Sequence, residues 1–260
     1  MEDEQLNIDF QERQSSYGKR VYVYFGILAI TVLFIFVVKA QWQDHVTVTH
    51  VSVEGAGILS REEIVRLMKL PPRASMYDLD LTSLQRNIRS NPFVKSVVIQ
   101  RDAPSRLQVI IEERVPVALL AGDELFYIDD EGIVLPYMTS SEAYDIPVIS
   151  GGDSISQIKA GRIILNSDIQ EALEIIKSAK AASAEIFHAI SEIKLRKGHD
   201  IVCYTFESGV PVIFGKGDVV QKIVKLDAFW QKFIQNNDTR DIQYIDIRFD
   251  GQVVVSRKNS

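Results

Sequence analysis

Apolar and polar residues follow different patterns in three parts of the chain. Residues 21–38 form one apolar run without a charged side chain. Residues 46–114 mix strand-like alternation with stretches whose apolar residues lie three or four positions apart. Residues 115–257 contain many short strand patterns and two longer helical patterns. Together these patterns predict one apolar helix followed by two folded domains.

The apolar run has the length of a membrane-spanning helix. At helical rise its 18 residues cover about 27 Å, close to the ~30 Å thickness of bilayer hydrocarbon. Lys19 and Arg20 precede the run, and only Lys39 follows it directly. The positive-inside rule therefore predicts a short cytoplasmic tail, residues 1–20, and an extracytoplasmic location for everything after the run.

A cleaved signal peptide is the competing interpretation of this run. Val38 and Ala40 place small residues on both sides of Lys39, as a cleavage site requires. The apolar core of a signal peptide usually spans about 7–15 residues, which is shorter than this run. A retained transmembrane helix over residues 21–40 is therefore favoured, and cleavage remains the alternative.

The first domain, residues 46–114, is predicted to be a small α+β module. After an alternating strand pattern, Ser60 and Glu63 form the capping box that begins a helix. Asp80 marks the start of a second helix, and two strands follow over 94–101 and 106–113. The order strand, helix, helix, strand, strand indicates helices packed on one face of a sheet.

The second domain, residues 115–257, is predicted to be β-rich with two helices. Amphipathic patterns place these helices at about 168–187 and 219–234. The domain closes with two strands, 242–249 and 252–256, around an Asp-Gly pair that is typical of a hairpin turn. The whole chain is therefore assigned to the α+β class, with one transmembrane helix.

Composition excludes several functions. The net charge of −6 argues against a nucleic-acid partner, which requires a basic face. Cys203 is the single cysteine, so no internal disulfide can form. Its position in a strand-like run predicts a small buried apolar residue rather than a reactive thiol.

No pattern of catalytic or metal-binding residues stands out. The four histidines lack metal-ligand spacing, and the chain has no phosphate loop or nucleophile motif. The acidic cluster Asp129–Gly132 fits a charged reverse turn better than a calcium loop. We therefore predict no enzyme activity, no cofactor, no metal and no small-molecule substrate. An anchored hydrolase remains an alternative only if His188, His199 and Asp200 surround one pocket.

The last strand pattern, residues 252–256, is a candidate interaction site. A final strand often lies at the edge of a sheet, where its free N–H and C=O groups accept a strand from a partner. Arg257 and Lys258 follow it directly. They are equally consistent with charges that protect an edge from aggregation, so both interpretations stay open.

Several motifs, in this order, resemble the FtsQ/DivIB family of bacterial cell-division proteins, and the first domain resembles a POTRA domain. The motifs are V-x-V-x-G (Val51, Val53, Gly55), NPFV (Asn91–Val94), EERVPVA (Glu112–Ala118), YxDxxG (Tyr127, Asp129, Gly132), Pro147 with Gly151, Gly209 with Gly215, and D-x-R-aromatic (Asp246, Arg248, Phe249). The resemblance covers about residues 20–257.

The resemblance implies a non-enzymatic scaffold of the division septum in the inner (plasma) membrane. It implies binding to the outer parts of FtsB and FtsL, and through them regulation of septal peptidoglycan synthesis by FtsW and FtsI. In this family the partner adds a strand to the last strand of the second domain. The corresponding residues here are Arg248, Phe249, Gln252, Val253, Val254 and Val255.

One departure from the family and one alternative function remain. Family members often carry an aromatic residue late in this strand, whereas this chain has Val255, Ser256 and Arg257. We therefore expect partner contacts to differ there. The alternative is a POTRA-type docking or chaperone protein for polypeptide export, which tandem modules or a pore would favour.

Overall fold

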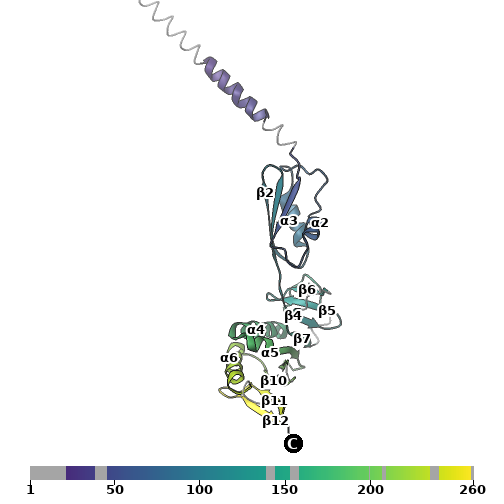
Figure 1. Ribbon diagram of the computed structural model, residues 1–260, viewed down its shortest axis with the longest axis vertical. Coiled ribbons are helices and arrows are strands. Elements are labelled where there is room, and N and C mark those ends of the chain that lie inside the picture. The colour runs from purple at the N-terminus through teal and green to yellow at the C-terminus, as the bar shows by residue number, and fades with distance from the viewer. Residues whose placement is uncertain are drawn as a thin grey trace, which may run out of the picture.

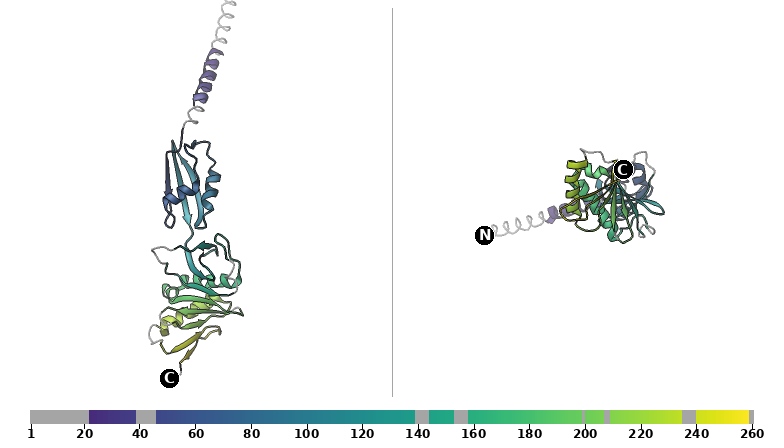
Figure 2. Two further views of the ribbon diagram at one scale, coloured as in Figure 1. Left: turned by 90° about the vertical axis from the view of Figure 1, so that its right-hand side faces the viewer. Right: turned by 90° about the horizontal axis from the view of Figure 1, so that it is seen from below.

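The protein is an elongated molecule in a computed structural model (Figures 1 and 2). A helix at 22–38 is followed by the first domain and then the second domain, and the C-terminus lies at the far end (Figure 1). The structure describes residues 22–38, 46–138, 144–152, 158–198, 200–206, 209–234 and 240–258. The predicted cytoplasmic tail, residues 1–20, lies outside these ranges.

The apolar run forms a helix over 22–38, and all of its described residues are exposed. Among the described residues, no helix combines the length and the apolar character needed to cross a membrane. The predicted span 21–40 extends beyond the described helix at both ends, so its role in a membrane stays a prediction.

The first domain has the predicted element order. It consists of β1 (His50–Glu54), α2 (Arg61–Met68), α3 (Leu81–Arg89), β2 (Val94–Asp102) and β3 (Arg106–Glu113). The three-stranded sheet has the order β1-β3-β2, with β1 parallel and β2 antiparallel to the central β3.

Local signals explain where the helices of this domain begin. The Ser60 hydroxyl accepts a hydrogen bond from the Glu63 N–H, and the Asp80 carboxylate accepts from the N–H groups of Thr82 and Ser83. Side-chain burial alternates along β3 because one face of the sheet packs against the helices. The predicted capping residues are thereby confirmed.

The second domain is built on a nine-stranded sheet with the order β12-β11-β10-β9-β8-β7-β4-β5-β6. Its strands are β4 (Pro116–Ala121), β5 (Leu125–Asp129), β6 (Val134–Pro136), β7 (Val148–Gly151), β8 (Ile190–Leu195), β9 (Ile201–Thr205), β10 (Pro211–Ile213), β11 (Ile242–Asp246) and β12 (Val254–Arg257). Its helices are α4 (Ser167–Ala182), α5 (Ala184–Ala189), α6 (Val219–Phe229) and the π-helical turn η2 (Trp230–Ile234).

Both helical segments predicted for this domain are present, but each consists of two elements rather than one continuous α-helix. The first breaks at Ser183, whose backbone is extended and whose hydroxyl accepts from the Ile186 N–H to start α5. The same hydroxyl lies 2.8 Å from the Asp227 carboxylate on α6. The second predicted helix changes to π-helical geometry from Trp230 onward.

A row of apolar side chains crosses the sheet beneath the helices. Cross-strand pairing joins Leu120, Ile149, Ile193, Cys203, Val212, Ile245 and Val255 in one continuous line. All but Val255 are buried in the core formed with α4 and α6. The predicted burial of Cys203 is confirmed, and this burial raises the pKa of its thiol to about 12.

The closing hairpin has shorter pairing between its strands and a longer loop than predicted. β11 ends at Asp246 rather than at residue 249, and β12 starts at Val254 rather than at residue 252. Beyond Asp246, the Ile247 N–H continues the pairing with β10 through the Ile213 carbonyl. The next N–H on the β12 side, that of Arg248, donates to the Asp246 carboxylate instead of to β12, so the ladder ends there. The Asp-Gly pair still forms the turn, but it lies within a loop over 247–253.

Candidate partner-binding site

β12 occupies one end of the nine-stranded sheet. Within the described ranges, β11 is the single strand that pairs with it, through an antiparallel ladder. An edge strand of this kind presents unpaired N–H and C=O groups along its outer side. The geometry therefore allows a further strand to be added here.

The side chains around β12 differ between the two faces of the sheet. On the helix-covered face, Val253 and Val255 are half-buried against the core. On the other face, Val254 is 39% exposed and pairs with Asp246. Phe249, in the loop before β12, is 46% exposed. Apolar surface is thus available on both sides of the open edge.

Arg248 is held in place by contacts at the end of β11 and on the β10 side of that strand. Its guanidinium donates to Asp246, with Nη2 to Oδ2 at 2.7 Å, and Asp246 also accepts the Arg248 N–H. The aliphatic part of Arg248 lies so close to Gly215 that a Cβ there would be 2.8 Å from it. Its Nη1 is 3.9 Å from Asp200. The guanidinium is therefore oriented before any partner arrives, and its exposed part can donate to an acidic group.

The ion pair shifts the pKa of both groups. Hydrogen bonds from Arg248 hold the pKa of the Asp246 carboxyl below its usual value, despite its burial. The same hydrogen bond raises the pKa of Arg248. Both groups are consequently charged at neutral pH.

Helix α6 runs beside the hairpin and adds residues that the sequence analysis did not single out. The Lys225 ammonium donates to the carbonyl groups of Ile247 and Phe249, which joins the helix to the loop before β12. Val220 and Val224 are each 59% exposed on this helix. The sequence does contain a signal for this exposed apolar surface, because Val220 and Val224 lie four residues apart on the polar side of the helical pattern.

The structure distributes the six predicted site residues over the loop and the strand. Val254 and Val255 belong to β12, whereas Gln252 and Val253 precede it. Arg248 and Phe249 lie at the start of the same loop. Their role in binding a partner stays a prediction.

The hydrolase alternative requires His188, His199 and Asp200 around one pocket. His188 and Asp200 instead have different neighbours. His188 pairs with Asp145 at 2.9 Å on the surface, and Asp200 faces Arg248. His199 lies outside the described residues. In the part of the chain that the structure describes, no three metal-ligating side chains gather at one point.

Comparison with protein families assigns both domains. A family model described as "POTRA domain, FtsQ-type" matches residues 46–114, and one described as "FtsQ/DivIB, C-terminal related" matches residues 115–256. The second match alone covers more than half of the chain.

Similar proteins carry consistent names. Cell division protein FtsQ of Geotalea daltonii is 30% identical over 201 residues, which cover 76% of this chain and 71% of the relative. FtsQ of Rhodothermus marinus is 27% identical over 88% of this chain and 84% of the relative. Cell division protein DivIB of Clostridium acetobutylicum is 23% identical over 80% and 82%. The chain therefore belongs to the FtsQ/DivIB family of cell-division proteins.

Proposed function

We propose that this chain is a non-enzymatic scaffold of the division machinery that binds FtsB- and FtsL-like proteins through β12. The partner contributes a strand that continues the sheet beyond β12. Through this complex the chain regulates the FtsW- and FtsI-like enzymes of septal peptidoglycan synthesis, at the septum of the inner (plasma) membrane.

The open edge is the observation that carries this proposal. The apolar row of the sheet ends at Val255, which is half-buried because β12 is the last strand of the sheet among the described residues. An apolar side chain on an added strand would extend the row and bury Val255 fully. Backbone hydrogen bonds would supply affinity, and Val254, Phe249 and Arg248 would supply selectivity.

A single membrane anchor completes the proposed arrangement. The uncharged run at 21–38 and the basic pair Lys19 and Arg20 support an N-terminus in the cytoplasm. Both domains then lie outside the cytoplasm. Alkaline phosphatase fused after residue 60 should be active if this topology is correct, whereas a cytoplasmic location would leave it inactive.

The edge is tested by matched substitutions of two exposed valines. Val254→Lys places a cation at the edge opposite Asp246, and because Val254 is 39% exposed we expect the fold to accommodate it. Val98→Lys makes the same change at a valine of β2 that is 45% exposed. We expect Val254→Lys to weaken binding of the FtsB–FtsL-like complex about 30-fold, which corresponds to ~2 kcal/mol for an interface anchor. Val98→Lys should bind like the parent, as measured by pull-down and biolayer interferometry.

A proline scan separates strand addition from side-chain docking. Successive N–H groups of an edge strand point to opposite sides, so Val254→Pro and Val255→Pro remove one outward and one inward donor. The substitution that leaves thermal stability unchanged has removed the outward N–H, and it should abolish binding. Unchanged binding by this variant would refute strand addition at β12.

A further inference from the structure

The two domains meet at a junction built from backbone and apolar contacts. The Arg114 N–H donates to the Phe93 carbonyl at 2.7 Å, where β3 leads into the second domain. Pro92 packs near Gly161, since a Cβ at Gly161 would lie 3.5 Å from the Pro92 ring. Tyr127 and Leu135 of the second domain are part of the same buried cluster as the first-domain core.

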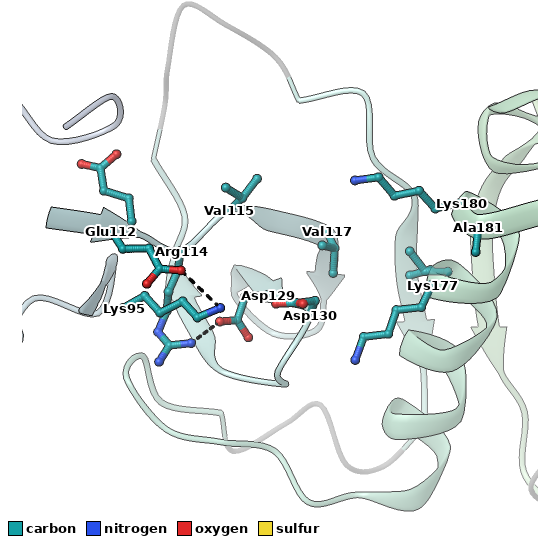
Figure 3. Close-up of a pocket in the computed structure, with 12 residues that line it drawn as sticks. Lys95, Glu112, Arg114, Val115, Val117, Asp129, Asp130, Lys177, Lys180 and Ala181 are labelled. Atoms are coloured by element: carbon teal, nitrogen blue, oxygen red, sulfur yellow. Dashed lines mark hydrogen bonds and ion pairs between the residues drawn. The ribbon is translucent and has the colours of Figure 1, made fainter. Parts of the chain in front are cut away.

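Ion pairs reinforce this junction. Arg114 Nη1 donates to Asp129 Oδ2 at 2.5 Å and to Glu131 Oε2 at 2.7 Å (Figure 3 shows the contact with Asp129). Asp129 is 1% exposed and also accepts the N–H groups of Glu131 and Ile133. Arg114 is therefore fixed to the turn between β5 and β6.

Lys95 adds a second link from the first domain. Its ammonium on β2 is 3.2 Å from Glu131 and 3.7 Å from Glu112. Glu131 thus receives one cation from the domain linker and another from the sheet of the first domain. Two separate points of attachment resist rotation better than one.

A pocket of about 510 Å³ lies on this side of the junction. Val115, Val117 and Ile176 line it, and Lys177 and Lys180 of α4 lie across it from Arg114 and Asp129 (Figure 3). Among the described residues, no ion pair joins α4 to the first domain across this space. The open space leaves room for the domains to bend toward each other.

We infer that Arg114 is a positioning residue that sets the orientation of the second domain relative to the first, through Asp129 and Glu131. The link holds the two domains as one elongated body. The functional consequence rests on the proposed function: β12, at the far end of that body, is presented to its partner at a fixed distance and direction from the helix at 22–38.

Spin-label distances in the full-length chain test this inference. Labels at Thr82→Cys on α3 and Glu174→Cys on α4 report the distance between the domains, because Cys203 is buried and unreactive. We expect a narrow distribution in the parent and at least a doubling of its width with Arg114→Gln. Arg106→Gln, which removes an exposed ion pair within the first domain, should leave the width unchanged.

Two further variants keep the test decisive. Labels at Glu174→Cys and Gln243→Cys lie within the second domain, so their distribution stays narrow if that domain remains folded. If Arg114→Gln also broadens the distance distribution within the second domain, Glu131→Gln replaces it as the test variant. The Glu131 carboxylate is half-exposed, so its loss removes the link to Arg114 without disturbing the buried turn, and the interdomain distribution alone should broaden. A broad interdomain distribution in the parent, or equal widths for the junction and control variants, would overturn the inference.

Partner binding distinguishes this inference from the proposed function. Arg114→Gln leaves β12 intact, so purified full-length variant should bind the FtsB–FtsL-like complex with parental affinity. It should nevertheless restore division poorly in cells that lack the parent chain. Failure of the parent itself to bind would refute the proposed function and leave the distance measurements valid. Full division with Arg114→Gln would refute the functional consequence of the link.

Discussion

The nine-stranded sheet has two edge strands, β6 and β12, and only one of them is covered by another described segment of the chain. At β6, the segment 161–164 covers the outer side, because Val134 exchanges backbone hydrogen bonds with Arg162 and Gly161. At β12, no described segment occupies the equivalent place. Both strands are short, so length does not distinguish them. The chain thus covers the β6 edge with its own backbone, whereas no described segment covers the β12 edge.

The charges at the end of β12 do not close the open edge. Arg257 pairs with Asp241 at 2.9 Å, and the Lys258 ammonium donates to the Arg240 carbonyl. These contacts tie both cations to the residues before β11. Protection against aggregation and partner binding are therefore compatible, since the charges flank a strand whose outer side is paired with no described strand.

The largest effect is expected at the covered edge. Asp129→Asn removes the negative charge from a nearly buried ion pair with Arg114. Because this leaves the Arg114 cation without its buried partner charge, the substitution should lower the free energy of unfolding by about 3 kcal/mol. It should also speed hydrogen exchange of the Val134 amide, so that the covered edge becomes more like the open one. Asp130→Asn, at the exposed neighbouring carboxylate, is the control. If urea unfolding shows the same loss of unfolding free energy for both variants, the stabilising role of the Asp129–Arg114 pair is contradicted.

A smaller, pH-dependent effect is expected beside the open edge. The folded pKa of Asp246 is lowered by Arg248, so its stabilisation is present above the usual value of 3.8 and is lost as the pH falls below it. Asp246→Asn should cost about 1.5 kcal/mol at pH 7, the range for hydrogen bonds to charged groups. Urea unfolding at pH 7 and pH 3 should show this difference shrinking in acid. A constant difference would argue against the ion pair.

The smallest effect is expected on β12 itself. Arg257 and Asp241 form an exposed pair, which contributes less than about 0.5 kcal/mol. Arg257→Gln should therefore leave the thermal midpoint within about 2 °C of the parent. Self-association measured by sedimentation should rise if this cation protects the edge. If the sedimentation profile is unchanged, Arg257 does not protect the β12 edge from self-association.

Much of the first domain and the position of the last strand could be predicted from local signals. Ser60 and Asp80 mark helix starts by their own chemistry, and period-two alternation marks strands. The edge location of β12 followed from its place at the end of the pattern, and the sheet order agrees.

What could not be predicted depends on contacts between distant residues. The helix break at Ser183 involves Asp227, which lies 44 residues away. The parallel pairing of β10 with β11 requires α6 to cross between them, which no local pattern encodes.

The buried acid of the junction shows the same limit. Asp129 looks like any carboxylate in a charged turn, and the turn itself was predicted correctly. Its near-complete burial depends on Arg114, fifteen positions earlier, which arrives from the end of another domain. A buried ion pair leaves no periodic signature, so the link between the domains became visible only in three dimensions.

The buried position of Cys203 has a chemical consequence for a protein proposed to work outside the cytoplasm. A thiol with a pKa of about 12 is almost fully protonated at neutral pH, and the thiolate is the species that attacks disulfides and reacts with oxidants. Two copies of the chain should therefore not become covalently crosslinked in an oxidising environment. The thermal midpoint and the oligomeric state should therefore be the same with and without reductant, and folding should not depend on a thiol oxidase.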